Sequence, residues 1–236
     1  MIKKQTKGKI FLAEERGLNE LKWFQSRNSF NFGKYYNEHK HPFKNLYVLN
    51  DDSLAGGHSM KMITEENFYV ILLPVIGAIA YGDDAGNKNL LAAGQAQIIL
   101  AEKPITYQIA NPFPEETVNF LQLWIKAGKN IPSDPPLALT YKDVNKNINQ
   151  PADIFLVNEQ KIDLPFSVSI GKFAGRGGYN YILNKKNSGL FVFVLTGAFE
   201  VEGRLLHARD GLSLWESDEV EMEALSNDAI VLLIEL

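Results

Sequence analysis

The side chains that could do chemistry in this 236-residue chain are few. The sequence contains four histidines, at positions 39, 41, 58 and 207, and no cysteine. Without cysteine, disulfides, thiolate metal sites and a cysteine nucleophile are all excluded. Any metal or acid–base chemistry must therefore come from histidines, carboxylates and hydroxyl groups.

The segment 56–72, GGHSMKMITEENFYVIL, combines a glycine pair, His58, the adjacent Glu65 and Glu66, and a run of β-branched and aromatic residues. His58 and position 63 would lie about 17 Å apart along an extended strand, too far to share one ion unless the glycine pair turns sharply. We therefore expect His58 to be a loop or strand-end residue.

The other histidines give weak signals for a metal site. His39 and His41 have the i, i+2 spacing of one strand face, but they come just before Pro42 in a segment typical of a turn. Two imidazoles without a third ligand bind metals weakly, so we expect both in a surface loop. His207 follows a predicted hairpin and should be exposed. The segment 173–181, FAGRGGYNY, lacks the lysine of a phosphate-binding loop and indicates a turn.

Composition narrows the class of protein. Hydrophobic residues make up 45% of the chain, charged residues 22%, and the formal net charge is −4 with no long basic run. These values are typical of a soluble globular protein and argue against a nucleic-acid surface. No apolar run has the length of a signal peptide or a membrane span. The expected location is cytoplasmic, without membrane attachment.

The elements that would position these residues are mostly strands. Several segments are short, rich in Val, Ile, Phe and Tyr, and bounded by Gly, Asn, Asp or Pro: 45–50, 67–82, 96–101, 119–127, 153–157, 189–203 and 229–236. This pattern predicts an all-β fold. One helix is predicted over residues 13–26, where the apolar residues near one face are Leu18, Leu21, Trp23 and Phe24, although Gly17 weakens the prediction.

The two halves of the chain resemble each other. Gly77-Ala78 and Gly197-Ala198 each follow a hydrophobic strand and precede an alternating strand, a tight turn and a Leu-Leu pair, 120 residues apart. A repeat of that length indicates a duplicated domain. A Pro-, Asn- and Lys-rich segment separates the copies. We predict domains at residues 1–128 and 153–236, joined by a linker at 129–152.

Each half has a strand that begins with glycine, then a Gly-Ala hairpin, then a second pair of strands that begins with glycine. This order resembles the layout of a cupin barrel. Two such barrels in tandem form a bicupin. The first half is further similar to the pirin family. The resemblance is carried by RGLNELKWFQSRNSFNFGKYYN, FKNLYVLNDD, GAIAYGDDAGN and ANPFPEETVNFLQLWI, which together cover most of residues 15–126. The second half, from about residue 190, resembles the C-terminal cupin of bacterial pirin-like proteins more loosely.

The resemblance implies two tandem double-stranded β-helix, jelly-roll-like barrels. In most members the N-terminal barrel holds iron or a similar divalent transition metal through a His-Pro-His pair and a His-x-Glu pair. Some members cleave quercetin with dioxygen, and animal members act as nuclear cofactors of transcription regulators.

The family's ligands are missing from the matching positions. Counted back from Gly77 without gaps, the His-Pro-His histidines fall on Ile63 and Glu65, and counted back from ANPFPEE, the other pair falls on Tyr107 and Ile109. One carboxylate cannot close a site that needs three or four donors. The two glycines that usually precede the second pair are replaced by Glu102 and Pro104. The expected metal and cofactor content is therefore none.

Glu65 has two interpretations. If Glu65 points inward among Ile63, Tyr107 and Ile109, with Met60 and Met62 nearby, its carboxylate would be desolvated, could form a hydrogen bond with Tyr107, and could act as an acid or base. Pointing outward at an open barrel mouth, it would be a solvated remnant, and we favour this interpretation.

Three functions follow from these positions. The first is a small-molecule-binding or regulatory bicupin with a degenerate metal site, whose expected partners are an unknown small molecule in the N-terminal barrel and a protein. The second is a metal-dependent, quercetin 2,3-dioxygenase-like oxidoreductase whose ligands come from elsewhere. The third is a metal-free enzyme with Glu65 and Tyr107 as catalytic residues. A shared fold does not choose among them.

Overall fold

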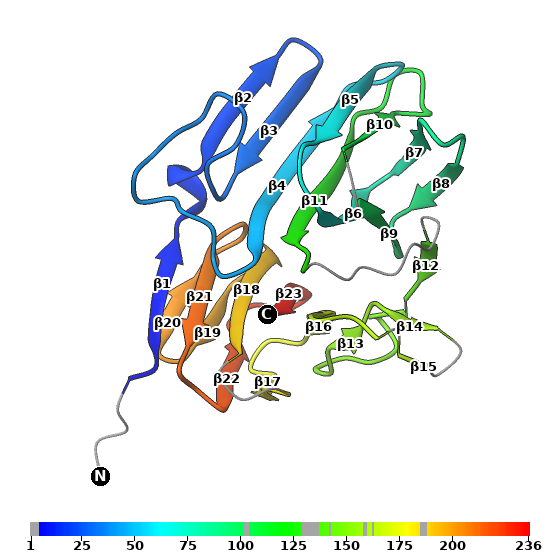
Figure 1. Cartoon of the computed structure of the whole chain (residues 1–236). Helices are drawn as coiled ribbons and strands as arrows, with labels where there is room; N and C mark the ends of the chain where they lie inside the picture. The colour runs from blue at the N-terminus through cyan, green and yellow to red at the C-terminus, as the bar shows by residue number, and fades with distance from the viewer. Residues whose placement is uncertain are drawn as a thin grey trace. The chain divides into compact units, whose positions relative to one another are not determined.

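The computed structural model describes residues 5–101, 104–128, 137–141, 143–157, 160–161, 163–184 and 188–236. These residues form strands almost throughout, with one short 3-10 helix, η1, at Ala13–Glu15 (Figure 1). The all-β prediction is confirmed. No helix in the described ranges has the length and apolar character needed to cross a membrane.

The chain divides into two compact units. We call Arg16–Thr140 the N-terminal unit, and Met1–Glu15 with Tyr141–Leu236 the C-terminal unit. This division differs from the predicted boundaries at 128 and 153. The first strand pairs with a strand near the end of the chain, and part of the predicted linker forms a strand of the N-terminal unit. Both segments are assigned to their units by backbone hydrogen bonds to strands far away in the sequence. A local sequence pattern cannot predict such long-range pairing.

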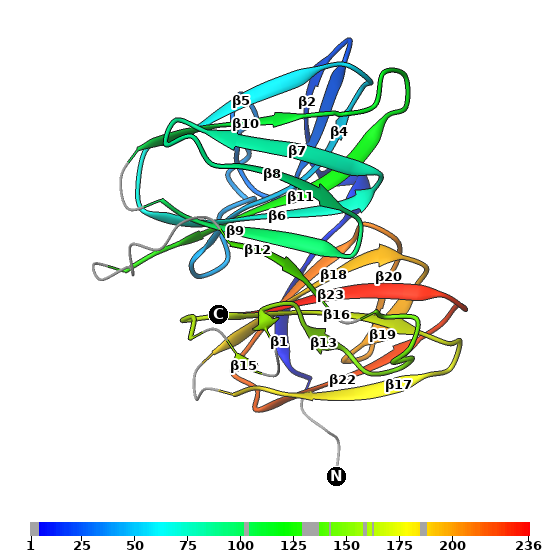
Figure 2. The ribbon, with the colours of Figure 1, turned by 90° about the vertical axis from the view of Figure 1, so that its right-hand side faces the viewer.

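The N-terminal unit contains two antiparallel sheets. Its larger sheet has, in spatial order, β12 (Leu137–Thr140), β9 (Gln95–Ala101), β6 (Phe68–Ile76), β11 (Val118–Lys126), β4 (Leu46–Leu54), β3 (Phe24–Asn28) and β2 (Gly17–Leu21). Its smaller sheet has β5 (Ser59–Thr64), β10 (Ile105–Ala110), β7 (Ala78–Asp83) and β8 (Lys88–Ala92), which lie together in Figure 2. Buried side chains from both sheets, including Val70, Phe120 and Tyr107, form one hydrophobic cluster.

The C-terminal unit repeats this arrangement. Its larger sheet runs β1 (Lys7–Phe11), β21 (Gly211–Trp215), β18 (Gly189–Thr196), β23 (Ala229–Glu235), β16 (Ser167–Phe173) and β13 (Ala152–Asp153). Its smaller sheet runs β17 (Gly178–Ile182), β22 (Glu219–Ala224), β19 (Phe199–Val201) and β20 (Arg204–Leu206), while β14 (Leu156–Val157) and β15 (Gln160–Lys161) form a separate pair.

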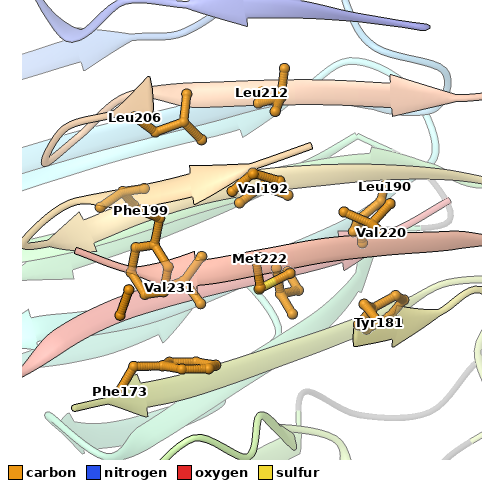
Figure 3. Close-up of a cluster of buried hydrophobic side chains, with 14 of the residues drawn as sticks. Phe173, Tyr181, Leu190, Val192, Phe199, Leu206, Leu212, Val220, Met222 and Val231 are labelled. Carbon is orange, nitrogen blue, oxygen red and sulfur yellow. The ribbon is translucent and has the colours of Figure 1, made fainter. Parts of the chain in front are cut away.

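Each unit has its own hydrophobic core. The core of the C-terminal unit gathers side chains from both of its sheets, among them Phe199, Leu212 and Met222 (Figure 3). The smaller sheets have matching strand orders, β5-β10-β7-β8 and β17-β22-β19-β20. Gly77 and Gly197 occupy equivalent hairpins with φ of 78° and 77°. The predicted internal duplication is therefore present in the strand order as well as in the sequence.

The helix predicted over residues 13–26 is wrong beyond its first turn. Residues 17–21 and 24–28 form the β2–β3 hairpin, with Gly17 opposite Asn28 and Leu21 opposite Phe24. β3 continues the sheet by pairing with β4. Leu18 and Leu21 are 47% and 56% exposed, so the apolar spacing does not mark a buried helical face. Pairing with β4 overrides the local helical pattern.

Candidate functional site

The candidate site lies on the inward faces of β5 and β10, the neighbouring strands of the smaller sheet in the N-terminal unit. Tyr107 and Ile109 on β10 are fully buried in the hydrophobic cluster. Met60 and Met62 on β5 pack against the same cluster and lie directly opposite Ile109 and Tyr107 in the antiparallel register. Directly opposite residues have Cβ atoms about 5 Å apart. These four side chains therefore form a compact group.

Two of the predicted positions point away from this group. Ile63 on β5 is 60% exposed, and Glu65 is exposed in the turn that follows the strand. Side chains alternate between the faces of a strand, so Met60 and Met62 face inward and Ile63 faces outward. The preferred interpretation of Glu65 as a solvated residue agrees with its position.

The ungapped count that selected Ile63 and Glu65 crosses an irregularity in β6. There, Asn119 of β11 is opposite Ile76 while Phe120 is opposite Pro74, which leaves Val75 without a partner. Such a bulge adds one residue to one strand, and a shift of one residue reverses every side chain. The inward residues of β5 are instead Met60, Met62 and Thr64.

The hydroxyl of Tyr107 is part of a buried polar chain. It donates to Gln122 Oε1 at 2.9 Å, and Gln122 Nε2 donates to Asp52 Oδ2. Burial raises the pKa of Tyr107 well above its usual value, and the nearby charge of Asp52 acts in the same direction. Tyr107 is therefore a neutral phenol at neutral pH and is not bonded to Glu65.

Asp52, at the end of this series of buried hydrogen bonds, is a residue that the sequence analysis did not identify. It is fully buried, and burial raises its pKa to about 7, although hydrogen bonds from Ser26 and Gln122 oppose the rise. The neighbouring Asp51 pairs instead with Arg16 at 3.1 Å. Adjacent carboxylates inside the hydrophobic segment LNDDSL were the available signal, because charged residues are seldom buried.

The histidines lie apart from this group. His58 is exposed, stacks on Trp23 with ring centroids 5.4 Å apart, and has Nδ1 2.7 Å from the Gly56 oxygen. His39, His41 and His207 are also exposed, which confirms the surface positions predicted for them. Over the described ranges, no three His, Asp or Glu side chains gather as a metal-binding cluster would require. Glu102 lies outside the described residues.

The donor set on β5 and β10 does not suit the family's metal. Iron and similar ions are held by imidazole and carboxylate groups. The facing positions offer two thioethers from Met60 and Met62, a neutral phenol that is already hydrogen-bonded, and the hydrocarbon side chain of Ile109.

Comparison with known proteins agrees with this architecture. The model of the family described as Pirin matches residues 12–125, and that described as Quercetinase C-terminal cupin domain matches residues 158–236. A protein named quercetin 2,3-dioxygenase, from Escherichia coli K12, is 24% identical over 95% of this chain and 96% of its own length. A pirin-like protein of Caulobacter vibrioides is 26% identical over 89% of this chain and 92% of its own.

Solved structures show the same fold. YhhW from Escherichia coli superposes with a TM-score of 0.85 at 22% identity, over 98% of this chain and 97% of that one. A structure described as bacterial pirin YhhW in complex with nickel(II) also gives a TM-score of 0.85 at 22% identity, over 98% and 99% of the two chains.

The duplicated sheets, with these matches, define a bicupin built from two tandem cupin barrels. Both halves match pirin-family domains in the expected order. The chain belongs to the pirin family.

Proposed function

We propose that this pirin-family bicupin works as a small-molecule-binding or regulatory protein without metal-dependent catalysis. The observation that carries the proposal is the composition of the inward faces of β5 and β10. The inward side chains of these two strands, Met60, Met62, Thr64, Tyr107 and Ile109, include neither imidazole nor carboxylate. A site of three or four such donors cannot be assembled from them.

The test is a metal titration on three proteins. Wild type is purified, incubated anaerobically with Fe²⁺ or Ni²⁺, desalted and analysed for bound metal. A restored variant carries Met60→His, Met62→His, Tyr107→His and Ile109→Glu. A matched control carries Ile63→His and Glu65→His with the same two β10 changes, so that it has the same added groups with two of them facing outward.

We expect the restored variant to bind metal at least about tenfold more tightly than wild type or the control, since three or four donors act together only when they face one point. Thermal melting with and without metal verifies that each variant folds and detects binding independently. Near-stoichiometric metal in wild type would overturn the proposal.

A second candidate function is a quercetin 2,3-dioxygenase-like activity, favoured by the names of the relatives. It requires metal ligands other than the residues on β5 and β10. Oxygen consumption with quercetin, measured on wild type before and after metal loading, separates it from the first proposal. Metal-dependent turnover would establish the dioxygenase.

Metal-free catalysis by Glu65 and Tyr107 has less support. Glu65 is exposed beyond the end of β5, whereas the Tyr107 hydroxyl is buried and bonded to Gln122. An acid–base pair would need both groups within reach of one substrate atom. A loss of turnover in Glu65→Gln with unchanged melting would restore this alternative.

A further inference from the structure

A polar cavity of about 270 Å³ is lined by residues of the C-terminal unit. Its lining residues lie on or beside β13 and β16 of the larger sheet and β17 of the smaller sheet. Among its lining residues are Asp153, Ser167, Ser169, Tyr179, Tyr181 and Asn184. Its volume is near the lower end of the range for small-molecule sites.

Small side chains on β16 leave this space. Phe173, at one end of the strand, faces inward and is part of the hydrophobic cluster. Two further positions on the same face, Ser169 and Ser167, line the cavity with small side chains where larger apolar residues would otherwise fill the core. Figure 3 shows Phe173 and Tyr181 along one margin of that cluster. The small side chains in the sequence of β16 therefore account for the cavity.

The polar side chains around the cavity are ordered by one buried carboxylate, Glu235. Its oxygens accept hydrogen bonds from the Tyr181 hydroxyl at 2.9 Å, from Ser188 Oγ at 2.9 Å, and from Asn184 N and Nδ2 at 2.7 Å. Burial alone would raise the pKa of Glu235, but these hydrogen bonds more than offset it and hold the pKa below its usual value. Glu235 therefore remains charged at neutral pH.

These bonds leave acceptors facing the cavity. The single hydrogen of the Tyr181 hydroxyl is used on Glu235, so the Ser167 hydroxyl, 3.4 Å away, must be the donor in their contact. The side-chain amide of Asn184 donates one of its two N–H groups to Glu235, which leaves its second N–H and its carbonyl oxygen. Tyr181 thus offers lone pairs rather than a proton.

Two further groups complete the lining. Asp153 is close enough for its charge to act with burial and with Glu235 in raising the pKa of Tyr181. Ser169 is 9% exposed, and within the described ranges its hydroxyl makes no hydrogen bond to another side chain. Among the described residues that line the cavity there is no lysine, arginine or histidine. The carboxylate of Asp153, the acceptor oxygens beside it and the buried charge of Glu235 behind Tyr181 repel anions and favour a ligand that donates hydrogen bonds.

We infer that this cavity is a second ligand site, one that takes a small organic cation with a primary ammonium group. The ammonium donates to Asp153, Ser169 and the Tyr181 oxygen, and the face of Tyr179 or Tyr181 packs against the carbon chain. This site is independent of the function proposed for the N-terminal barrel.

The test uses three four-carbon probes on the full chain: putrescine, 1,4-butanediol and succinate, which carry two ammonium, hydroxyl or carboxylate groups. Calorimetric titrations at pH 7 in about 0.15 M salt limit non-specific attraction to an acidic protein. We expect putrescine to bind and the other two probes to bind at least about tenfold more weakly. Absence of putrescine binding, or equal binding of either other probe, would overturn the inference.

Variants locate the binding. Asp153→Asn removes a charge but keeps the Oδ1 that accepts from Phe155 N at 2.9 Å, and should weaken putrescine binding about tenfold. Ser169→Leu fills the cavity and should abolish binding. Glu200→Gln, on an exposed residue of β19, is the charge-matched control and should bind as wild type.

Melting curves show whether each variant is folded. Putrescine binding that survives Ser169→Leu would place the ligand elsewhere on the chain. Displacement of putrescine by equimolar potassium would indicate an inorganic cation site. Either result contradicts the inference.

Discussion

At the scale of single residues, the N-terminal barrel contains a carboxyl group that is costly to ionise. Asp52 is fully buried; its Oδ2 accepts from Gln122, and its Oδ1 has no hydrogen-bond partner within the described part of the chain. A neutral acid tolerates an unpaired oxygen in this environment better than a carboxylate does. This arrangement explains why burial raises the pKa of Asp52 from 3.8 to about 7.

Asp52 should make the protein less stable as the pH rises. Between the unfolded pKa of 3.8 and the folded pKa of about 7, the folded chain binds more protons than the unfolded chain, so the free energy of unfolding falls across this window and levels off above it. Asp52→Asn removes this contribution. The measured quantity is the free energy of unfolding of wild type minus that of Asp52→Asn. This difference should decrease by on the order of 2 kcal/mol from pH 5 to pH 8.

Urea unfolding at four pH values between 5 and 8 measures this difference. Glu65→Gln is the control, because it removes an exposed carboxylate from the same unit and should follow wild type at every pH. Parallel pH profiles for wild type and Asp52→Asn would show that Asp52 titrates near its ordinary value.

At the scale of elements, one hairpin in each barrel turns at a glycine, Gly77 in the N-terminal unit and Gly197 in the C-terminal unit. Gly77 connects β6 to β7 with a φ of 78°, a conformation that side chains with a Cβ adopt at a cost. A Cβ there would lie 2.9 Å from Val118 Cγ1 and 3.3 Å from Phe113 Cε2. Backbone strain and close packing therefore both require glycine at this hairpin.

Gly77→Ala should destabilise the N-terminal unit more than Gly86→Ala. Gly86 also has a positive φ, of 88°, but a Cβ there would meet no atom within 4 Å. Gly86→Ala should lower the free energy of unfolding by about 1 kcal/mol, from backbone strain alone. Gly77→Ala should lower it by about 1–3 kcal/mol more, because of the steric contact with Val118 and Phe113. Urea midpoints of both variants give the comparison, and equal losses would show that Val118 moves aside freely.

At the scale of the whole molecule, the polypeptide begins in one unit and passes through the other before returning. β1 pairs with β21 along its full length, from Lys7 opposite Trp215 to Phe11 opposite Gly211. The Phe11 ring lies 5.5 Å from the Phe191 ring on β18. The C-terminal unit therefore depends on residues about two hundred positions away in sequence.

Deleting residues 1–11 should expose an edge of the C-terminal barrel. The amides of β21 that bond to β1 should exchange hydrogen faster, and the Tm should fall, because β21 loses one neighbour and Phe191 loses a ring contact. Hydrogen exchange by mass spectrometry tests this. Peptides from β4 in the N-terminal unit serve as the internal control, and unchanged exchange in β21 would refute the dependence.

The sequence by itself determined the strand-rich class and the duplication. Runs of β-branched and aromatic residues, and glycines in hairpins that need positive φ, are local properties that can be read directly. The family resemblance followed from the same residues. The surface positions of the four histidines also followed from their local context.

The tertiary structure alone decided which side chains share the barrel interior. A strand alternates its faces every residue, so the register of β5 places Met60, Met62 and Thr64 inward and leaves Ile63 exposed. The buried chain from Tyr107 to Asp52, the cavity beside Glu235, and the pairing of β1 with β21 join residues far apart in sequence. Such contacts depend on register and sheet order, which long-range pairing sets.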